Sequence, residues 1–130
     1  MTERIVRVVA AVIEREGRYL VTQRRPMAVL PNLWEFPGGK VEPGETDALA
    51  LRREIKERLD ADVEVQQMIS FVRHPYERYT VDLHLYQCSL LSEVRAAQVQ
   101  SFKWLCSDEF DDYEFTPADE ASMSKLLGEP

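Results

Sequence analysis

Two carboxylates in the middle of the chain stand where they could share a metal ion. Residues 38–60 read GGKVEPGETDALALRREIKERLD, a doubled glycine at Gly38-Gly39 followed by a helical pattern. Since a helix advances about 100° per residue, Glu54 and Glu57 lie on one face, a turn apart. Oxygen ligands at fixed spacing suit a hard divalent cation such as Mg²⁺, and a glycine-rich loop lets the backbone approach a ligand closely. The pattern therefore indicates a site where Mg²⁺ neutralises a polyphosphate and orients water.

The same charges have a simpler explanation as a solvated helix face. Arg53 with Glu57, and Glu54 with Arg58, stand at the four-residue spacing of ordinary surface ion pairs, each worth a few tenths of a kcal/mol. Glu45 and the glycine loop weigh against this explanation, because surface pairs need neither of them.

Together these residues resemble the Nudix box, G-x5-E-x7-R-E-U-x-E-E-x-G-U, where U is a bulky apolar residue. The matching positions are Gly39, Glu45, Arg53, Glu54, Ile55 and Glu57. Nudix hydrolases split a nucleoside diphosphate linked to another group, and they use Mg²⁺ or Mn²⁺. The resemblance covers nearly the whole chain and implies a single domain over residues 1–130. Its fold class would be α/β (α+β), a Nudix-like α/β/α sandwich with a mixed β-sheet.

The resemblance also implies a role for each matching side chain. Glu54 would organise or deprotonate water, and Arg53 would orient the glutamates. Glu45 would either ligate a second cation or hold the loop. The metal ligands would be Glu54, Glu57 and the carbonyl of Gly38, with Mg²⁺ or Mn²⁺ as the cofactor.

The chain departs from the box where the chemistry is concentrated. Arg58 stands where the family has the second acid of its E-E pair, usually a metal ligand, and a guanidinium repels a cation. Asp60 replaces the box glycine and lies about 200° further round the helix, so it does not restore the missing ligand. Gln98 takes the place of a further acid of the MutT-like branch, on an ungapped alignment.

Two outcomes stay open. A weaker site could still hydrolyse its substrate, with Arg58 in a phosphate-binding or ion-pairing role. Alternatively, the domain binds a nucleotide with little or no turnover. We favour hydrolysis, because Glu45, Arg53, Glu54 and Glu57 would otherwise have little reason to stand together.

A second resemblance concerns the substrate. The stretches LWEFPGGKVEPGE and Thr116-Pro117-Ala118-Asp119 are similar to MutT-type enzymes, which release a monophosphate and pyrophosphate from nucleoside triphosphates. A cytidine or a modified nucleotide is among the candidates. In the cytidine branch the residue at Asp119 lies near the base, and a carboxylate can accept from the exocyclic amine of cytosine or adenine. The alternative is structural, since an acid in this position completes a capping box with Thr116.

Four more residues are candidates for substrate contacts. By resemblance and stacking ability, Phe36, Tyr76 and Leu83 would line the base pocket, although packing in the core is at least as good an explanation. Arg24 ends a predicted strand, where relatives place a basic residue near the phosphates, or else it is surface charge. The compact chain disfavours a third function, hydrolysis of a dinucleotide or nucleotide sugar.

The apolar pattern predicts the elements that position these residues. Residues 4–14 and 18–24 predict a hairpin around Glu16-Gly17, and a short strand at 33–36 precedes the glycine loop. Apolar residues at three- and four-residue spacing predict a helix from Thr46 to about Asp60, capped by Thr46 or Asp47. Three further strands are predicted at 63–74, 79–90 and 97–105, a short helical turn at 107–109, and a last helix from Thr116.

Composition narrows the partners. The chain has 130 residues, 45% of them apolar, and 23 acidic against 16 basic residues give a net charge of -7. This charge disfavours polymeric nucleic acid, which selects basic surfaces. No apolar run is long enough to span a membrane, and the N-terminus does not resemble a signal peptide. We therefore expect a cytoplasmic protein with a nucleotide substrate, either a monomer or a homodimer.

The remaining reactive side chains carry no pattern of their own. Cys88 and Cys106 lack metal or redox spacing and predict two buried thiols. His74 and His84 have no partner at a metal-ligand spacing, so both are expected in packing or surface roles.

Overall fold

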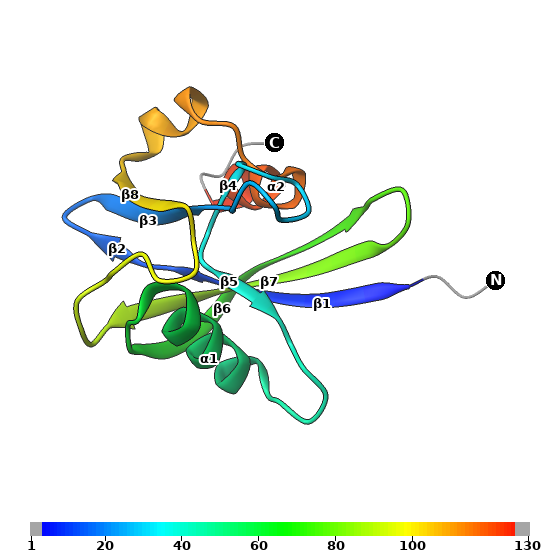
Figure 1. Cartoon of the computed structure of the whole chain (residues 1–130), viewed down its shortest axis with the longest axis horizontal. Helices are drawn as coiled ribbons and strands as arrows, with labels where there is room; N and C mark the ends of the chain where they lie inside the picture. Colours follow the sequence, from blue (N-terminus) through cyan, green and yellow to red (C-terminus); the bar gives the residue numbers. More distant parts are fainter. Residues whose placement is uncertain (1–3, 127–130) are drawn as a thin grey trace.

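Strand β1 (Ile5–Val12) contributes to both halves of the hydrophobic core. The computed structural model describes residues 4–126. Successive side chains of a strand point to opposite faces. Val9 and Ala11 accordingly pack with helix α1 (Asp47–Leu59). Ala10 and Val12 pack with helix α2 (Pro117–Leu126) on the other side. The two helices lie on opposite sides of the strands in Figure 1, which confirms the predicted α/β/α sandwich.

The strands form two sheets. The first has the order β5 (Gly38–Lys40), β1, β7 (Thr80–Leu90), β6 (Val63–Pro75). Within it β1 and β7 are parallel and the other pairs antiparallel, as predicted for a mixed sheet. The second sheet is antiparallel and contains β2 (Glu14–Arg15), β3 (Arg18–Gln23), β4 (Trp34–Glu35) and β8 (Ser101–Leu105). A short 3-10 helix, η1 (Ser107–Asp112), follows β8.

The doubled glycine, Gly38-Gly39, lies in strand β5, whereas the sequence predicted a loop there. β5 pairs with β1, with Gly38 opposite Ala10 and Gly39 opposite Val9. A Cβ atom at Gly38 would overlap the backbone of Val9 and Ala10. Glycine is therefore required there because two backbones approach closely, and the strand carries the box glycine to the side of α1.

Two other boundaries differ from the prediction. The strand expected over 97–105 begins only at Ser101, because the N–H groups of Ala97 and Gln98 donate to the carbonyl of Arg58 instead of pairing in the sheet. The first hairpin is divided at Ile13, where the chain passes from one sheet to the other. The ends of the predicted single domain, residues 1–3 and 127–130, lie outside the described residues.

Helix α1 has the predicted buried face and cap. Leu51, Ile55 and Leu59 are fully buried. The Thr46 hydroxyl accepts from the N–H of Leu49 at 3.2 Å. At the other end Asp60, which replaces the box glycine, adopts a left-handed conformation with φ 49°. The glycine of the box thus corresponds to a helix C-cap, the position where glycine relieves backbone strain.

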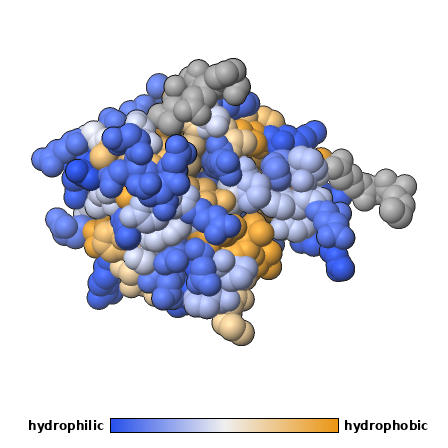
Figure 2. All heavy atoms as spheres, turned by 90° about the horizontal axis from the view of Figure 1, so that it is seen from above, coloured by the Kyte–Doolittle hydropathy of each residue, from blue (hydrophilic) through white to orange (hydrophobic). Residues whose placement is uncertain are grey.

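No helix within residues 4–126 combines the length and the apolar character needed to cross a bilayer. Figure 2 shows one face covered mostly by hydrophilic side chains, with apolar atoms visible in hollows between them.

The thiols and imidazoles match the prediction in part. Cys88 is buried, and burial raises the pKa of its thiol to about 12. The prediction of a second buried thiol is wrong, because Cys106 is partly exposed and its thiol donates to Glu109 at the start of η1. His84 is buried on β7, whereas the ring of His74 stacks edge-on against Tyr76.

We predict that the Asp60→Ala variant is less stable than the Asp60→Gly variant by about 1 kcal/mol, the cost of a Cβ atom in the left-handed region. Both variants lose the same ion pairs to Arg95 and Lys56, so their difference isolates the backbone. Urea unfolding of both proteins measures it. Equal free energies of unfolding would contradict the assignment of Asp60 as a strained cap.

Candidate active site

Arg53, on α1, lies at the centre of a cluster of glutamates, two from the same helix and one from the loop before it. Its Nε and Nη2 atoms donate to the two carboxylate oxygens of Glu45 at 2.7 and 2.9 Å. Its Nη1 donates to Glu54 at 2.8 Å and reaches Glu57 at 3.5 Å. Nη2 also donates to the carbonyl of Lys40 in β5, at 3.0 Å. One guanidinium thereby connects the box glutamates to the glycine strand.

Both carboxylate oxygens of Glu45 accept hydrogen bonds from the chain. Arg53 engages both oxygens, and the N–H of Glu42 donates to one of them at 2.9 Å. These hydrogen bonds lower the pKa of Glu45 to about 2. Of the two roles considered for Glu45, its geometry therefore fits the one that holds the loop before α1.

Glu54 is the buried carboxylate of the cluster, with only 7% of its surface exposed. It lies directly against β5, where a Cβ atom at Gly39 would overlap its carboxylate. A second arginine holds its other oxygen, since Arg58 Nε donates to Oε2 at 2.7 Å. Glu54 is thus held between Arg53 and Arg58, one on each oxygen.

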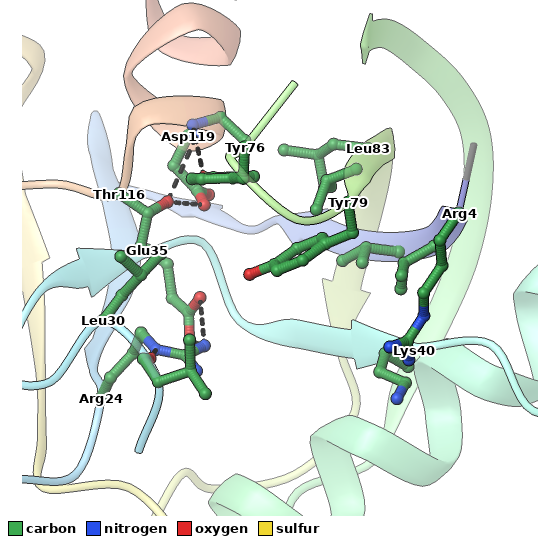
Figure 3. A pocket seen from close by; sticks show the side chains of 15 residues that line it. Arg4, Arg24, Leu30, Glu35, Lys40, Tyr76, Tyr79, Leu83, Thr116 and Asp119 are labelled. Atoms are coloured by element: carbon green, nitrogen blue, oxygen red, sulfur yellow. Dashed lines mark hydrogen bonds and ion pairs between the residues drawn. The ribbon is translucent and has the colours of Figure 1, made fainter. Parts of the chain in front are cut away.

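A cavity of about 380 Å³ opens beside this cluster. Four of the five predicted substrate residues line it: Arg24, Tyr76, Leu83 and Asp119. Figure 3 shows Glu35 and Asp119 at one side of the cavity and Arg4 and Lys40 at the other. The walls are otherwise largely aliphatic and aromatic, with Tyr79 among the residues that the sequence analysis did not identify.

Phe36 does not line this cavity, contrary to expectation. Its ring is 2% exposed and packs edge-on against Phe110 in the core. Phe36 instead contacts a residue of the cavity wall through its backbone, whose N–H donates to Asp119 at 2.9 Å.

Asp119 is a buried carboxylate held from two sides. It accepts from the N–H of Phe36 and from the hydroxyl of Thr116. Burial and the negative charge of Glu35 raise its pKa to about 7. The capping box is incomplete, because the N–H of Thr116 donates to Trp34 rather than to the Asp119 side chain. Capping alone therefore does not account for this carboxylate.

Glu35 is the main residue that the sequence analysis missed. It pairs with Arg24 at 3.2 Å, and burial raises the pKa of Glu35 while Arg24 and Arg58 oppose the rise. The available signal was a single charge within the apolar run Leu33-Trp34-Glu35-Phe36, directly before the glycine strand. A charge in such a run is buried on one side of the strand, where it needs a partner or a ligand.

Gln98, which the alignment puts in the place of a further acid, lies close to the end of α1. Its backbone N–H donates to the carbonyl of Arg58 at 3.0 Å, which places it at the C-terminal end of α1. Its side chain is exposed and carries no charge, so it adds no metal-ligating oxygen of the carboxylate kind.

Comparison with known proteins identifies the family of the chain. A model of the Nudix domain matches residues 8–125. The chain belongs to the Nudix family. It is 33% identical over 132 residues to the CTP pyrophosphohydrolase of Escherichia coli strain K12, with 98% of each chain covered. It is 28% identical over 131 residues to the 8-oxo-dGTP diphosphatase of Haemophilus influenzae, covering 99% of this chain and 96% of the relative.

A solved structure supports the fold. The crystal structure of a MutT Nudix hydrolase from Burkholderia pseudomallei superposes with a TM-score of 0.86 at 25% identity, covering 95% of this chain and 99% of that one. The predicted place of the chain among MutT-like Nudix hydrolases is confirmed.

Nudix hydrolases generally use divalent metal ions. The carboxylates of this Nudix protein fit such an ion when substrate phosphates supply the remaining ligands. No three acidic, histidine or cysteine side chains within residues 4–126 are grouped to hold an ion by themselves. Glu57 is open to solvent, with 48% of its side chain exposed, and Glu54 lies beside it. Mg²⁺ is commonly held by one or two carboxylates and substrate phosphates. The residues present fit that arrangement.

The raised pKa of Asp119 predicts a pH dependence of stability. The group titrates at about 7 in the folded protein, against 3.8 for the ordinary side chain. Between these values the unfolded chain has released a proton that the folded chain keeps. The contribution of Asp119 to the free energy of unfolding is therefore fully present below the lower value and is lost as the pH rises toward the upper one.

Urea unfolding between pH about 4 and about 7 should consequently show a flatter profile for Asp119→Asn than for the native protein. His84, whose pKa is lowered by burial, acts in the opposite direction but is present in both proteins. Parallel profiles would show that Asp119 does not keep its proton on folding.

Proposed function

We propose that this Nudix protein hydrolyses a nucleoside triphosphate to its monophosphate and pyrophosphate with the help of Mg²⁺ or Mn²⁺. The observation that carries the proposal is the adjacency of two features. One is the glutamate and arginine cluster on α1, and the other is a cavity of about 380 Å³ with basic and acidic ends. A nucleotide has the same division, with an anionic tail and an uncharged base that carries hydrogen-bonding groups.

The basic side chains of the cavity would bind the triphosphate. Arg4 and Lys40 line the end opposite Asp119, and the carbonyl of Lys40 accepts from Arg53. Arg24 also lines the cavity, at the other end, where it pairs with Glu35. The positive charge of the basic side chains offsets the repulsion between the substrate phosphates and the acidic cluster. The phosphates would then lie next to Glu54 and Glu57, whose carboxylates would bind the divalent ion.

Hydrolysis of the substrate needs a positioned water and a stabilised leaving group. The oxygen of water forms a bond to a phosphorus atom of the α–β linkage. The bridging P–O bond breaks, and its electron pair stays on the oxygen of the phosphate group that leaves. Glu54, held by Arg53 and Arg58, would accept the proton or hydrogen-bond the water. A divalent ion, when bound, neutralises charge on the phosphates. Glu57 and Glu54, with the carbonyl of Gly38, would hold it.

We further infer that the base carries an exocyclic amine. Asp119 and Glu35 present carboxylate oxygens at one side of the cavity, and carboxylates accept hydrogen bonds from amines such as the N4 of cytosine. Tyr76 and Leu83 supply apolar surface for the ring. The relative named CTP pyrophosphohydrolase supports cytosine as the base. Because another relative is named 8-oxo-dGTP diphosphatase, a modified purine nucleotide is also a substrate to test.

A second candidate function is nucleotide binding with little turnover. The observation that favours it is the ion pair of Arg58 with Glu54, which occupies an oxygen that catalysis needs. Turnover measurements separate the two functions.

We predict release of pyrophosphate from at least one member of a panel of CTP, dCTP, UTP, ATP, GTP and 8-oxo-dGTP in the presence of Mg²⁺ or Mn²⁺. The Glu57→Gln variant should lower kcat by about 100-fold, because it removes the exposed charged ligand. Glu64→Gln, an exposed acid on β6, is the matched control and should retain native kcat. No turnover by the folded native protein across the panel would reject hydrolysis in favour of binding alone.

We predict that above pH about 7, where Asp119 is ionised, Asp119→Asn lowers the ratio of kcat/KM for CTP over UTP by about 10-fold, the effect of one lost hydrogen bond to a charged acceptor. Glu120→Gln, the exposed neighbour on α2, should leave the ratio unchanged. An equal loss for both nucleotides, together with a lower Tm, would assign Asp119 a structural role instead.

A further inference from the structure

Arg58 supplies a positive charge where the Nudix box has a negative one. The cluster contains three carboxylates, Glu45, Glu54 and Glu57, and two guanidiniums, Arg53 and Arg58, which leaves one net negative charge. With the second box glutamate in place of Arg58, the same group would carry three. A cluster of three negative charges repels a triphosphate strongly unless metal ions neutralise it, whereas this one is almost neutral by itself.

The geometry leaves part of Arg58 available to a ligand. Its Nε is spent on Glu54, at 2.7 Å. Its two Nη atoms make no hydrogen bond to any of residues 4–126, and 28% of the side chain is exposed. A guanidinium has five N–H donors in a planar fork, and the terminal pair matches two oxygens of a phosphate.

Arg58 is not among the residues that line the cavity, but its charge reaches the cavity wall. Its charge acts on Glu35, a residue of the cavity wall, and so does the charge of Glu54. Arg24 pairs with the same glutamate at 3.2 Å. Arg58 therefore belongs to the glutamate cluster, beside which the phosphates of the nucleotide would lie, and its charge also extends to the cavity wall at Glu35.

We propose that Arg58 is a resident cation of this site, which holds Glu54 through Nε and binds a phosphate of the nucleotide through its Nη atoms. As a consequence the nucleotide binds without a divalent ion. The proposal rests on the proposed function for the identity of the ligand, and it concerns binding rather than turnover. Arg58 would thus have a function at the one box position where a positive charge replaces a negative one.

A purely structural role for Arg58 makes a different prediction. A glutamate and an arginine four residues apart on a helix stabilise it by a small amount when partly exposed. In that case removing the guanidinium changes the stability slightly and leaves nucleotide affinity as it was.

Equilibrium binding of the non-hydrolysable analogue α,β-methylene-CTP, with the ATP analogue in parallel, tests the proposal. Titration calorimetry in excess EDTA and again in Mg²⁺ compares the native protein with Arg58→Gln. The native protein should bind in EDTA with a Kd within about 10-fold of its value in Mg²⁺. Arg58→Gln should bind about 10- to 100-fold more weakly than the native protein in EDTA, the range for one lost charged contact.

Two further variants separate the guanidinium from its charge and from the helix. Arg58→Lys keeps the charge without the fork, and we expect it to bind in EDTA with an affinity between those of the native protein and Arg58→Gln. Arg52→Gln removes an exposed arginine from the same helix and should bind as the native protein does. Circular dichroism and Tm establish that each variant is folded.

Binding of Mn²⁺ without nucleotide provides a second readout. Arg58→Glu restores the acid of the box, and electron paramagnetic resonance should detect Mn²⁺ bound at least about 10-fold more tightly than by the native protein, since a carboxylate replaces a repelling charge. Equal Mn²⁺ affinity in the two proteins would count against Arg58 as the cation of the site.

Native and Arg58→Gln proteins with equal affinity in EDTA would overturn the proposal, as would complete loss of native binding on chelation. Either result leaves the proposed hydrolysis standing if the native protein turns over a triphosphate with Mg²⁺. Conversely, metal-free binding that depends on Arg58, without turnover of any triphosphate, rejects the hydrolysis and retains the resident cation.

Discussion

The hydrogen bonds of Arg53 hold the site together. The box glutamates repel one another, and a helix that carries them close to a strand of glycines needs a fixed positive charge between the two. Arg53 supplies it by binding Glu45, Glu54 and the carbonyl of Lys40 at once. Because its donors are rigidly arranged, these partners are placed relative to one another as well as neutralised. This one side chain thereby joins the loop, the helix and the β5 strand.

The close approach of β5 to its neighbours is the second constraint. Gly38 lies against β1 and Gly39 against Glu54, and in both places a Cβ atom would overlap its neighbour. The sandwich brings α1 to one side of β1 and α2 to the other, so the box and Asp119 come from different layers. The cavity forms where β4, β5 and the turn between β6 and β7 meet α2 (Figure 3).

Burial gives the two acids of the cavity different properties from those on α1. Glu45 is paired with an arginine at the surface, and its pKa falls. Asp119 and Glu35 are buried near each other, and their pKa values rise. One side of the site is therefore organised around fixed charge, while the other can exchange a proton near neutral pH. That division suits a ligand with an anionic tail and a hydrogen-bonding base.

The sequence by itself determined the α1 helix with its cap and buried face, most strand positions, the box and its departures at Arg58 and Asp60. These follow from local periodicity and spacing, which a linear chain displays directly. Only the tertiary structure decided that the doubled glycine is a strand, that Phe36 contributes its backbone rather than its ring, and that Glu35 joins Asp119. Each of these depends on what another segment brings alongside: β1 against β5, Phe110 against Phe36, α2 against β4. Such contacts join residues that are distant in the chain, and periodicity carries no information about them.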